Sequence, residues 1–382
     1  MRIVQVGYEF DERLDDPDAL LDRYVTLTGW SDALVGAGAS EVAVVHRFKR
    51  EAAIRRHGVD YVFVRDGAAG RPRIWSPTAA VHACVAARRP DLVHVNGTDF
   101  YPQMWWLRRA IDGQAALVVQ DHGGGVPRRR VIVNGLQRRL MRAADGFLFT
   151  AAAQAGQWLD RGLVADRRRV FEVLEASTSL RPMDRDNARA ISGVHGRPAL
   201  LWVGRLNANK DPLTVLDGFE RALPDLDGAA LTMVYGEGGE LPAVQARVSA
   251  SSALRDRVRL AGRVPADRMA AYFSAADIFV LGSHHEGSGY ALIEACACGA
   301  LPVVTDIPSF RAITGGGRVG VLWKPGDALQ CSRALVAAAR RDLDVEGRAM
   351  RDHFERHLSW EAVGHRALEV YGEISARLRA SM

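Results

Sequence analysis

One stretch decides the fold: Ile278-Phe-Val-Leu-Gly-Ser-His-His-Glu286-Gly-Ser-Gly-Tyr290-Ala-Leu-Ile-Glu294-Ala-Cys-Ala-Cys-Gly299. It consists of a short apolar run, a turn that contains two glycines, and a helical segment. A second apolar run, Leu301–Thr305, follows directly. A strand, a helix and a further strand in this order are typical of a βαβ unit in a parallel sheet. The stretch therefore predicts an α/β fold.

The same alternation extends over most of the chain. The runs are apolar throughout, as strands covered on both faces of a sheet should be. In the first half they are Arg2–Val6, Glu41–Val45, Leu92–Val95, Ala116–Gln120, Gly146–Thr150 and Val170–Leu174. In the second half they are Ala199–Val203, Leu231–Tyr235, Arg257–Leu260, Ile278–Leu281, Leu301–Thr305 and Val319–Trp323. We expect two doubly wound α/β domains.

A polar segment separates the two halves. Residues 181–198 contain Pro182, Gly193, Gly196 and Pro198, a composition typical of a linker. We therefore expect a first domain over residues 1–180, a linker over 181–198 and a second domain over 199–359. Residues 360–382 have apolar side chains at helical spacing, so we expect a final helix that packs back on the first domain.

Length and composition agree with this division. A chain of 382 residues is long enough for about two domains. Its 48% hydrophobic and 25% charged residues are typical of a soluble globular protein. No apolar run reaches the roughly 18–20 residues that span a bilayer, and the start does not resemble a secretory signal. These features predict a cytoplasmic protein.

Four cysteines do not form a disulfide framework or a metal site. Cys296 and Cys298 are two residues apart in a predicted helix, so they point to different faces, and no second pair has zinc spacing. We interpret them as small buried apolar residues, and we expect no metal and no bound cofactor.

The charge balance is mildly basic. The 50 basic and 45 acidic residues give a net charge of +5, which suits a phosphorylated ligand but does not indicate nucleic acid. Only three of the basic residues are lysines, namely Lys49, Lys210 and Lys324. The position of each lysine is therefore informative.

The turn around Glu286 is the first candidate site. In a parallel sheet, ligands bind beyond the carboxyl ends of the strands. Gly287 and Gly289 allow close approach of backbone to a ligand, and the helix that begins near Tyr290 directs its positive end to the same place. Glu286 and Glu294 flank this anion site, and carboxylates there suit a ligand that also offers sugar or ribose hydroxyls. The alternative is a helix cap with a solvent-facing Glu294.

A cationic turn follows the first strand of the second half. It reads Val203-Gly-Arg205-Leu-Asn-Ala-Asn-Lys210-Asp211-Pro212. Arg205 and Lys210 together could neutralise a diphosphate, although a solvated surface is the alternative. The next turn, Tyr235–Leu241, lacks the third glycine of a dinucleotide fingerprint, so a nicotinamide enzyme is a weak alternative.

The first half offers His122 and Gly7. His122 follows the strand Ala116–Gln120 within the glycine-rich turn Gln120–Gly125 and could face a ligand there, or it could serve packing alone. Gly7 follows the first strand, and we expect it to allow close approach of a ligand. The basic stretch Arg128–Arg142 could lie on an anionic membrane, although a solvated helix face explains it better.

Together these motifs resemble the family 4 retaining glycosyltransferases. Glu286 and Glu294 are similar to their E-x7-E signature, and the Gly204–Asp211 segment is similar to their diphosphate-binding turn. The resemblance continues in further landmarks, in order Asp91–Gly97, Gln120–Gly125, Val234–Gly238, Leu260–Val264 and Leu358–Val363.

The resemblance implies two Rossmann-like domains facing across a cleft, the GT-B architecture, and metal-independent transfer of a sugar from a nucleoside-diphosphate sugar with retention of configuration. Arg205 and Lys210 would bind the diphosphate, and Glu294 the ribose. His122 would contact the donor sugar from the first domain. The remaining donor-binding residues would be Gly7, Glu286, Gly287, Ser288, Gly289 and Tyr290 at the sugar, and Arg263 with its backbone neighbours near the base. The acceptor would be a glycan, a lipid-linked sugar or a small molecule.

Two alternatives stay open. One is a nucleotide-sugar-binding or partner protein without transfer activity, and the other is a sugar-nucleotide epimerase on the same architecture. The sequence departs from the family in three places. The loop after Gly7, which in the family often meets the donor phosphate or the acceptor, lacks paired glycines, and Glu175–Ser179 replaces the usual Pro-Asn-Gly-Val-Asp stretch near the hinge. Ser288 and Tyr290 replace the usual Phe and Leu beside Glu286.

Overall fold

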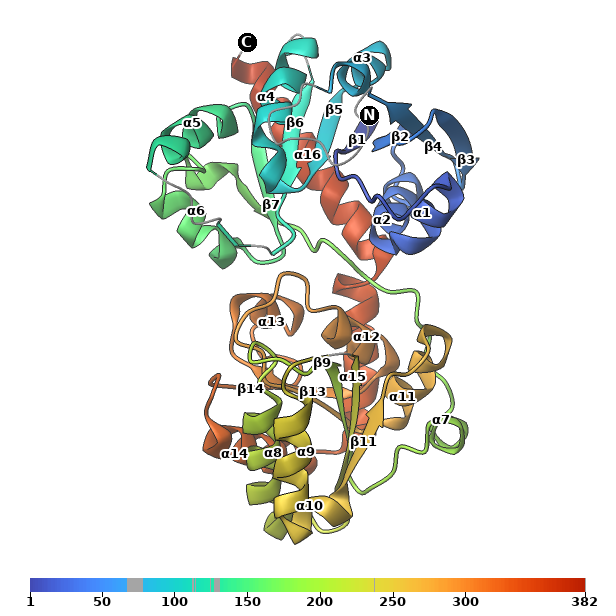
Figure 1. Ribbon diagram of the computed structural model, residues 1–382, viewed down its shortest axis with the longest axis vertical. Coiled ribbons are helices and arrows are strands. Elements are labelled where there is room, and N and C mark those ends of the chain that lie inside the picture. The colour runs from blue at the N-terminus through green and yellow to red at the C-terminus, as the bar shows by residue number, and fades with distance from the viewer. Residues whose placement is uncertain are drawn as a thin grey trace. The chain divides into compact units, whose positions relative to one another are not determined.

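The computed structural model describes residues 1–66, 78–111, 113, 115–123, 125–126, 131–236 and 238–381. The chain forms two compact units. The first comprises Met1–Ala176 together with Trp360–Met382, and the second comprises Ser177–Ser359. The polypeptide therefore leaves the first unit, builds the whole of the second, and returns to the first for its last helix (Figure 1).

The segment expected to be a linker, residues 181–198, differs from that expectation. It belongs to the second unit and contains helix α7 (Arg185–Ser192). The Asp184 side chain caps the helix by accepting a hydrogen bond from the Asn187 N–H at 3.0 Å, and Gly193 ends it with φ of 66°. Some of the polar and glycine residues in this segment therefore begin and end a helix instead of forming a linker between the domains.

The first unit is built on a mainly parallel sheet. Among the described residues the strand order is β3-β4-β2-β1-β5-β6-β7-β8, and only β3 is antiparallel to its neighbour. The strands are β1 (Arg2–Gly7), β2 (Glu41–Phe48), β3 (Ala52–Arg56), β4 (Val59–Arg65), β5 (Leu92–Asn96), β6 (Ala116–Gln120), β7 (Gly146–Phe149) and β8 (Val170–Glu172). The order reverses between β1 and β5, and ligands bind parallel sheets at such a switch point.

The hairpin of β3 and β4 was not predicted from the sequence. Strand β3 alternates between half-buried and exposed residues, so it lacks the apolar run that marks a covered strand. His57 and Gly58 form its two-residue turn with φ of 49° and 85°. Positive φ at both central residues is typical of the turn that joins tightly paired antiparallel strands.

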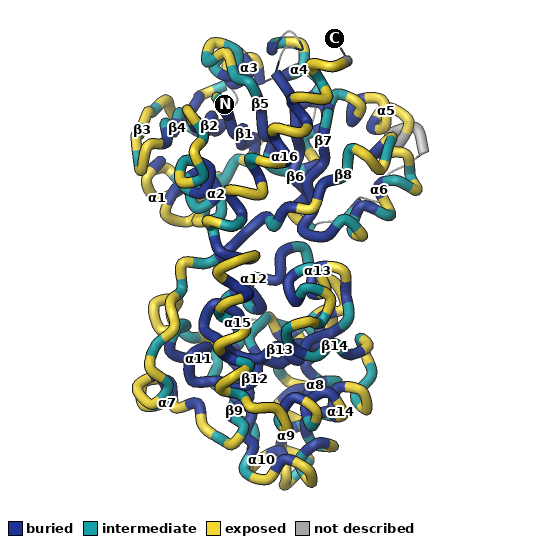
Figure 2. The backbone as a smooth tube through the Cα atoms, turned by 180° about the vertical axis from the view of Figure 1, so that it is seen from behind, coloured by how far each residue is buried: buried dark blue, intermediate teal, exposed yellow. Residues whose placement is uncertain are grey.

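Helices cover the sheet of the first unit. They are α1 (Pro17–Arg23), α2 (Val25–Gly36), α3 (Ala79–Ala87), α4 (Tyr101–Ala110), α5 (Val131–Met141), α6 (Gly156–Asp160) and the final helix α16 (Trp360–Ser381). Helix α16 packs on α2 and buries Val363, Ala367, Val370, Tyr371 and Ile374 in the core of this unit (Figure 2). The final helix is thus an integral part of the first unit.

The second unit has a parallel sheet of its own. Its strand order within the described residues is β11-β10-β9-β12-β13-β14, and these pairs are all parallel. The strands are β9 (Ala199–Arg205), β10 (Ala230–Gly236), β11 (Val258–Gly262), β12 (Ile278–Leu281), β13 (Leu301–Thr305) and β14 (Val321–Trp323). The order reverses between β9 and β12, which places the switch point at the turns after these two strands.

Besides α7, the helices of the second unit are α8 (Pro212–Ala222), α9 (Leu241–Ala250), α10 (Ser252–Arg257), α11 (Met269–Ala275), α12 (Tyr290–Cys298), α13 (Pro308–Ile313), α14 (Ala328–Ala339) and α15 (Leu343–His357). The predicted fold class, two α/β units with parallel doubly wound cores, is confirmed. Across the described residues, no helix is both long and apolar enough to cross a membrane.

Candidate active site

Two turns of the second unit meet at the switch point between β9 and β12. Asn209 lies in the turn after β9 and joins it to the turn after β12 with three hydrogen bonds. Its carbonyl accepts from the His284 N–H at 2.8 Å, its side-chain oxygen accepts from the His285 N–H at 3.1 Å, and its amide donates to the His285 carbonyl at 2.9 Å. The two sequence motifs are therefore held together as one platform.

Lys210 and Glu286 form an ion pair across this platform. The Lys210 ammonium donates to Glu286 Oε1, and the Ser283 hydroxyl donates to the same oxygen at 2.7 Å. The two side chains are only 19% and 13% exposed, so water screens the pair weakly. The sequence motifs predicted both residues as functional but did not predict their pairing. An ammonium group has three donors, so this contact still leaves Lys210 capacity to bind a ligand oxygen.

Asp211 fixes the start of helix α8 beside the ion pair. Its φ of 43° is uncommon for a residue other than glycine, and its side chain accepts a hydrogen bond from the Thr214 N–H at 3.3 Å. His284 Nε2 lies 3.0 Å from Asp211 Oδ2. A Cβ atom at Gly282 would lie 3.0 Å from the Asp211 carbonyl oxygen, so a larger residue would push the two turns apart by a few tenths of an ångström.

Two arginines at the same edge of the sheet have no partner. Arg205 ends β9 and Arg263 directly follows β11; both are exposed, and neither side chain forms a hydrogen bond or ion pair with any described residue. An unpaired guanidinium at a strand's carboxyl end can bind a phosphate oxygen without first breaking another contact. The structure thus places both arginines where the sequence predicted them.

Helix α12 begins at the same platform. Gly289 precedes it with φ of 67°, and a Cβ atom there would lie 3.0 Å from Ile313 Cδ1. Ser288 is buried, whereas the Tyr290 side chain is 45% exposed. The positive end of the helix therefore faces the region of Glu286 and Gly287, as the sequence predicted, and favours an anionic ligand there.

Glu294 lies one turn inside helix α12 and is half-buried. Burial raises the pKa of its carboxyl group to about 7, so the group is partly protonated near neutral pH. Burial disfavours the ionised form of this carboxyl group. A ligand that donates hydrogen bonds to the group would stabilise the ionised form. The hydroxyl pair of a ribose would do so.

Replacing Glu294 by glutamine should stabilise the protein more at pH 8 than at pH 5. The pKa in the folded state, about 7, exceeds the value near 4.3 of an exposed glutamate, so the folded state holds the proton more tightly. Wild-type stability is therefore lost as the pH rises through this window, by up to about 3 kcal/mol, while glutamine stays neutral. Urea denaturation of both proteins at the two pH values measures the difference. A difference that is equal at both values, or that appears equally for the exposed Glu361→Gln, would contradict the prediction.

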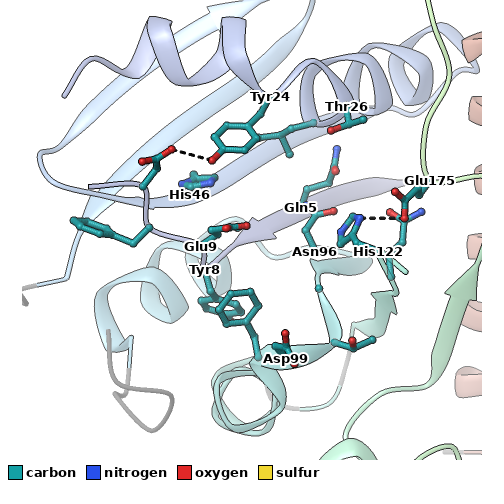
Figure 3. A pocket seen from close by; sticks show the side chains of 18 of the residues that line it. Gln5, Tyr8, Glu9, Tyr24, Thr26, His46, Asn96, Asp99, His122 and Glu175 are labelled. Atoms are coloured by element: carbon teal, nitrogen blue, oxygen red, sulfur yellow. Dashed lines mark hydrogen bonds and ion pairs between the residues drawn. The ribbon is translucent and has the colours of Figure 1, made fainter. Parts of the chain in front are cut away.

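The first unit contains a pocket of about 1030 Å³ at its own switch point (Figure 3). Its wall includes Gly7 at the end of β1, Asn96 at the end of β5, and His122 after β6. These three strands are neighbours in the sheet, so their carboxyl ends converge on one place. The pocket is large enough for a ligand of several rings.

His122 forms an ion pair with Glu175 in this pocket. Its Nδ1 atom lies 3.4 Å from Glu175 Oε2, and Glu175 is 4% exposed (Figure 3). Burial by itself would lower the pKa of the imidazole, but the hydrogen bond and negative charge of Glu175, with Asp121 and Glu9, raise it above the ordinary value. His122 therefore stays cationic to a higher pH than a free histidine.

Glu175 was not predicted as a site residue. It occupies the segment after β8 where the sequence departs from the resembled family, and no local motif identifies it. The one signal in the sequence was that an acidic residue begins the segment Glu175–Ser179, which replaces the usual Pro-Asn-Gly-Val-Asp stretch. Its partner follows β6 and lies 53 residues earlier in the chain, so only the folded sheet brings the two together.

Gly7 lines the pocket, but the space beside it is already filled. A Cβ atom at Gly7 would lie 2.4 Å from His46 Cδ2, on the neighbouring strand β2. Burial lowers the pKa of His46, which favours the neutral ring. Packing against His46 is therefore one reason for glycine here, and the part of Gly7 in ligand approach stays a prediction.

The basic stretch is only partly described. Arg128–Arg130 lie outside the described residues, and the structure places Arg138, Arg139 and Arg142 as exposed side chains at or just after the end of α5. Cys296 and Cys298 are buried with free thiols, as predicted. In the described part of the chain, no three His, Cys, Asp or Glu side chains gather closely enough to hold a metal ion.

Residues 197–341, which lie inside the second unit, match the family model described as glycosyl transferases group 1. This match supports sugar transfer as the activity. A GDP-mannose:cellobiosyl-diphosphopolyprenol alpha-mannosyltransferase of Xanthomonas campestris is 27% identical over 296 residues, which cover 75% of each chain.

Two further proteins are similar to this chain over more residues than the family model matches. A D-inositol 3-phosphate glycosyltransferase of Geodermatophilus obscurus is 30% identical over 284 residues, which cover 70% of this chain and 60% of the relative. The HepE protein of Anabaena, solved in complex with UDP and glucose, superposes with a TM-score of 0.68 at 14% identity and covers 98% of this chain and 100% of HepE. The likeness to solved structures shows that the fold is the two-domain GT-B architecture of glycosyltransferases.

Proposed function

We propose that the protein transfers a sugar from a nucleoside-diphosphate sugar to a hydroxyl group of an acceptor, with retention of the anomeric configuration and without a metal ion. The observation that carries this proposal is the platform at the β9–β12 switch point. There Lys210 is ion-paired with Glu286 beside the positive end of helix α12, and the unpaired Arg205 ends the neighbouring strand β9 at the same edge of the sheet. This combination suits a ligand that is a diphosphate on one side and a polyol on the other.

Each part of the platform has a role in this proposal. Arg205 and Lys210 bind the diphosphate, and Glu294 accepts hydrogen bonds from the ribose. Glu286 and the backbone from Gly287 to Tyr290, including Ser288 and Gly289, hold the donor sugar, and Arg263 lies on the side of the base. His122 of the first unit contacts the sugar. The names of the relatives, which include a GDP-mannose-dependent enzyme, support a nucleotide-sugar donor.

The reaction breaks the bond between the anomeric carbon and the diphosphate oxygen. The bonding electrons stay on the diphosphate, so negative charge grows there while the sugar becomes cation-like. Lys210 and Arg205 stabilise this charge at fixed positions, which is the main catalytic effect that such a site can supply. The acceptor oxygen bonds to the anomeric carbon on the face that the diphosphate leaves, and its proton passes to the departing phosphate. Glu286, held by Lys210 and Ser283, stabilises the cation-like sugar and forms no covalent bond in this scheme.

Calorimetric titration with UDP, GDP and ADP, each repeated with EDTA, tests the donor site. We expect one nucleotide to bind with the same affinity in both conditions, and we expect binding to be strongly weakened in Lys210→Ala. Lys324→Ala, an exposed lysine in the same unit, is the matched control. Binding that disappears with EDTA would overturn metal independence. Absence of nucleotide binding to the wild-type protein would overturn the donor site.

Product analysis separates transfer from its alternatives. Incubation with the nucleotide sugar and a panel of acceptors should release nucleoside diphosphate only when an acceptor is present, and the product should keep the donor's anomeric configuration by NMR. A changed sugar without an acceptor would indicate an epimerase. Inverted configuration would contradict the retaining mechanism.

A further inference from the structure

The pocket of the first unit is strongly acidic, in contrast to the chain as a whole. The chain carries a net charge of +5. Among the described residues that line this pocket, however, six are acidic and only one is a lysine or arginine. The acidic residues are Glu9, Asp11, Glu12, Asp99, Asp121 and Glu175, and the arginine is Arg13; His122 also lines the pocket and is paired with Glu175.

Several of these carboxylates lack a permanent cationic partner. Asp11 is paired with Arg13 at 2.9 Å, which accounts for the one arginine. In the described part of the chain, no lysine or arginine forms an ion pair with Glu9, Asp99 or Asp121. Glu9 and Asp99 are exposed at the pocket, and burial raises the pKa of Asp121, the direction expected where negative charge is poorly compensated (Figure 3).

A buried amide in the same wall also has an unused hydrogen-bonding atom. Gln5 is fully buried, and its Oε1 atom has no partner among the described residues. Its Nε2 atom donates to the Ser31 hydroxyl at 2.7 Å, and that hydroxyl in turn donates to the Leu27 carbonyl at 2.8 Å. Because the Ser31 hydroxyl can then only accept from Gln5, the nitrogen must face Ser31, and the oxygen is the atom left unused.

A second buried amide of the pocket wall has an unused hydrogen-bond donor. Gln120 lines the pocket, is 2% exposed, and its Nε2 atom has no partner within the described ranges. An unsatisfied buried amide costs free energy unless a ligand or water completes it. Both amides belong to residues of the pocket wall, and the unused acceptor of Gln5 and the unused donor of Gln120 favour a ligand whose own groups both donate and accept hydrogen bonds.

We propose that this pocket binds the acceptor, and that the acceptor is a polyol that carries ammonium groups, such as an amino sugar or an aminocyclitol. The inference rests on the proposed transferase function and specifies its substrate class. Glu9, Asp99 and Asp121 would neutralise the ammonium groups, and the Gln5 and Gln120 amides would bind the ring substituents. The same charges repel phosphate, so a phosphorylated acceptor or a lipid diphosphate fits this pocket poorly.

Calorimetry of the full chain tests the proposal without a donor. The probes are 2-deoxystreptamine, its di-N-acetyl derivative, which has the same ring without charge, and inositol phosphate. We expect the diamine to bind at least about tenfold more tightly than the acetylated form, with an affinity that falls as salt rises, and inositol phosphate not to bind. Equal binding of the charged and acetylated probes, or preferred binding of the phosphate, would overturn the proposal.

Two variants locate the binding site. Glu9→Gln combined with Asp99→Asn should weaken diamine binding several-fold, whereas Glu51→Gln, an exposed glutamate of the same unit that does not line the pocket, should leave it unchanged. Equal loss in both variants, or none in the first, would contradict the assignment. Nucleotide titration of the same samples keeps the two proposals distinguishable. Nucleotide binding without amine binding refutes only this inference, and amine binding without nucleotide binding refutes only the donor site.

Discussion

Replacing Lys210 by alanine should lower the turnover number about a hundredfold to a thousandfold, the loss typical of removing one group that stabilises transition-state charge. Two effects act together. The departing diphosphate loses a cation, and the Glu286 carboxylate, which is 13% exposed, loses its ion-pair partner. Steady-state kinetics with the nucleotide sugar identified by calorimetry measures the change.

The matched variants make this prediction specific. Lys324→Ala should leave turnover unchanged, and Lys210→Arg should retain part of it because the charge is kept. The double variant Lys210→Ala with Glu286→Gln should lose less than the product of the two single losses, since the two residues act as one unit. Independent losses, or normal turnover in Lys210→Ala, would show that the pair has no part in the reaction.

Replacing Glu175 by glutamine should lower the pKa of His122. Burial favours the neutral ring, and the hydrogen bond with the Glu175 carboxylate, followed by the charge of that carboxylate, acts most strongly in the opposite direction. A neutral glutamine removes the charge and weakens the hydrogen bond, so the effect of burial increases. The loss of the cationic form should therefore begin at a lower pH in the variant. If the cation contacts the donor sugar, the alkaline limb of the kcat/KM profile moves to lower pH, and activity at pH 8 falls below that of the wild type.

NMR titration of the His122 ring tests this directly, apart from any activity. Glu172→Gln is the control, because Glu172 lies on the preceding strand and its carboxylate accepts a hydrogen bond from the Ala152 N–H instead. An unchanged His122 titration in Glu175→Gln would refute the coupling. A shifted His122 titration together with an unchanged kcat/KM pH profile would confirm the ion pair and show that it has no part in catalysis.

The sequence predicted the sheets more completely than the sites. Strands such as β9 and β12 are apolar on both faces, so each gives a continuous run that composition alone reveals. Strand β3 has one exposed face and no such run, and it was not predicted. The segment 181–198 was predicted as a linker because helix caps and linkers share the same polar residues and glycines.

Site residues were predictable where one local motif contains them. Lys210 and Glu286 each stand in a recognisable turn, but their contact joins positions 76 residues apart and depends on the β9–β12 pairing. Glu175 stands in no motif, and its importance comes only from its distance to His122. Gly7 was predicted from the general role of glycine, and its packing against the ring of His46 on strand β2 could be seen only in the folded sheet.

The return of the chain to the first unit determines the order in which the protein can fold during synthesis. Domains generally fold as they emerge from the ribosome. The second unit is one continuous segment, and Ser177 and Leu358 at its two ends are joined by a hydrogen bond of 2.5 Å. The first unit lacks Val363, Val370 and Ile374 of its core until α16 has been made. The second unit can therefore be complete while the first unit, although its synthesis begins earlier, still lacks the helix that completes its core.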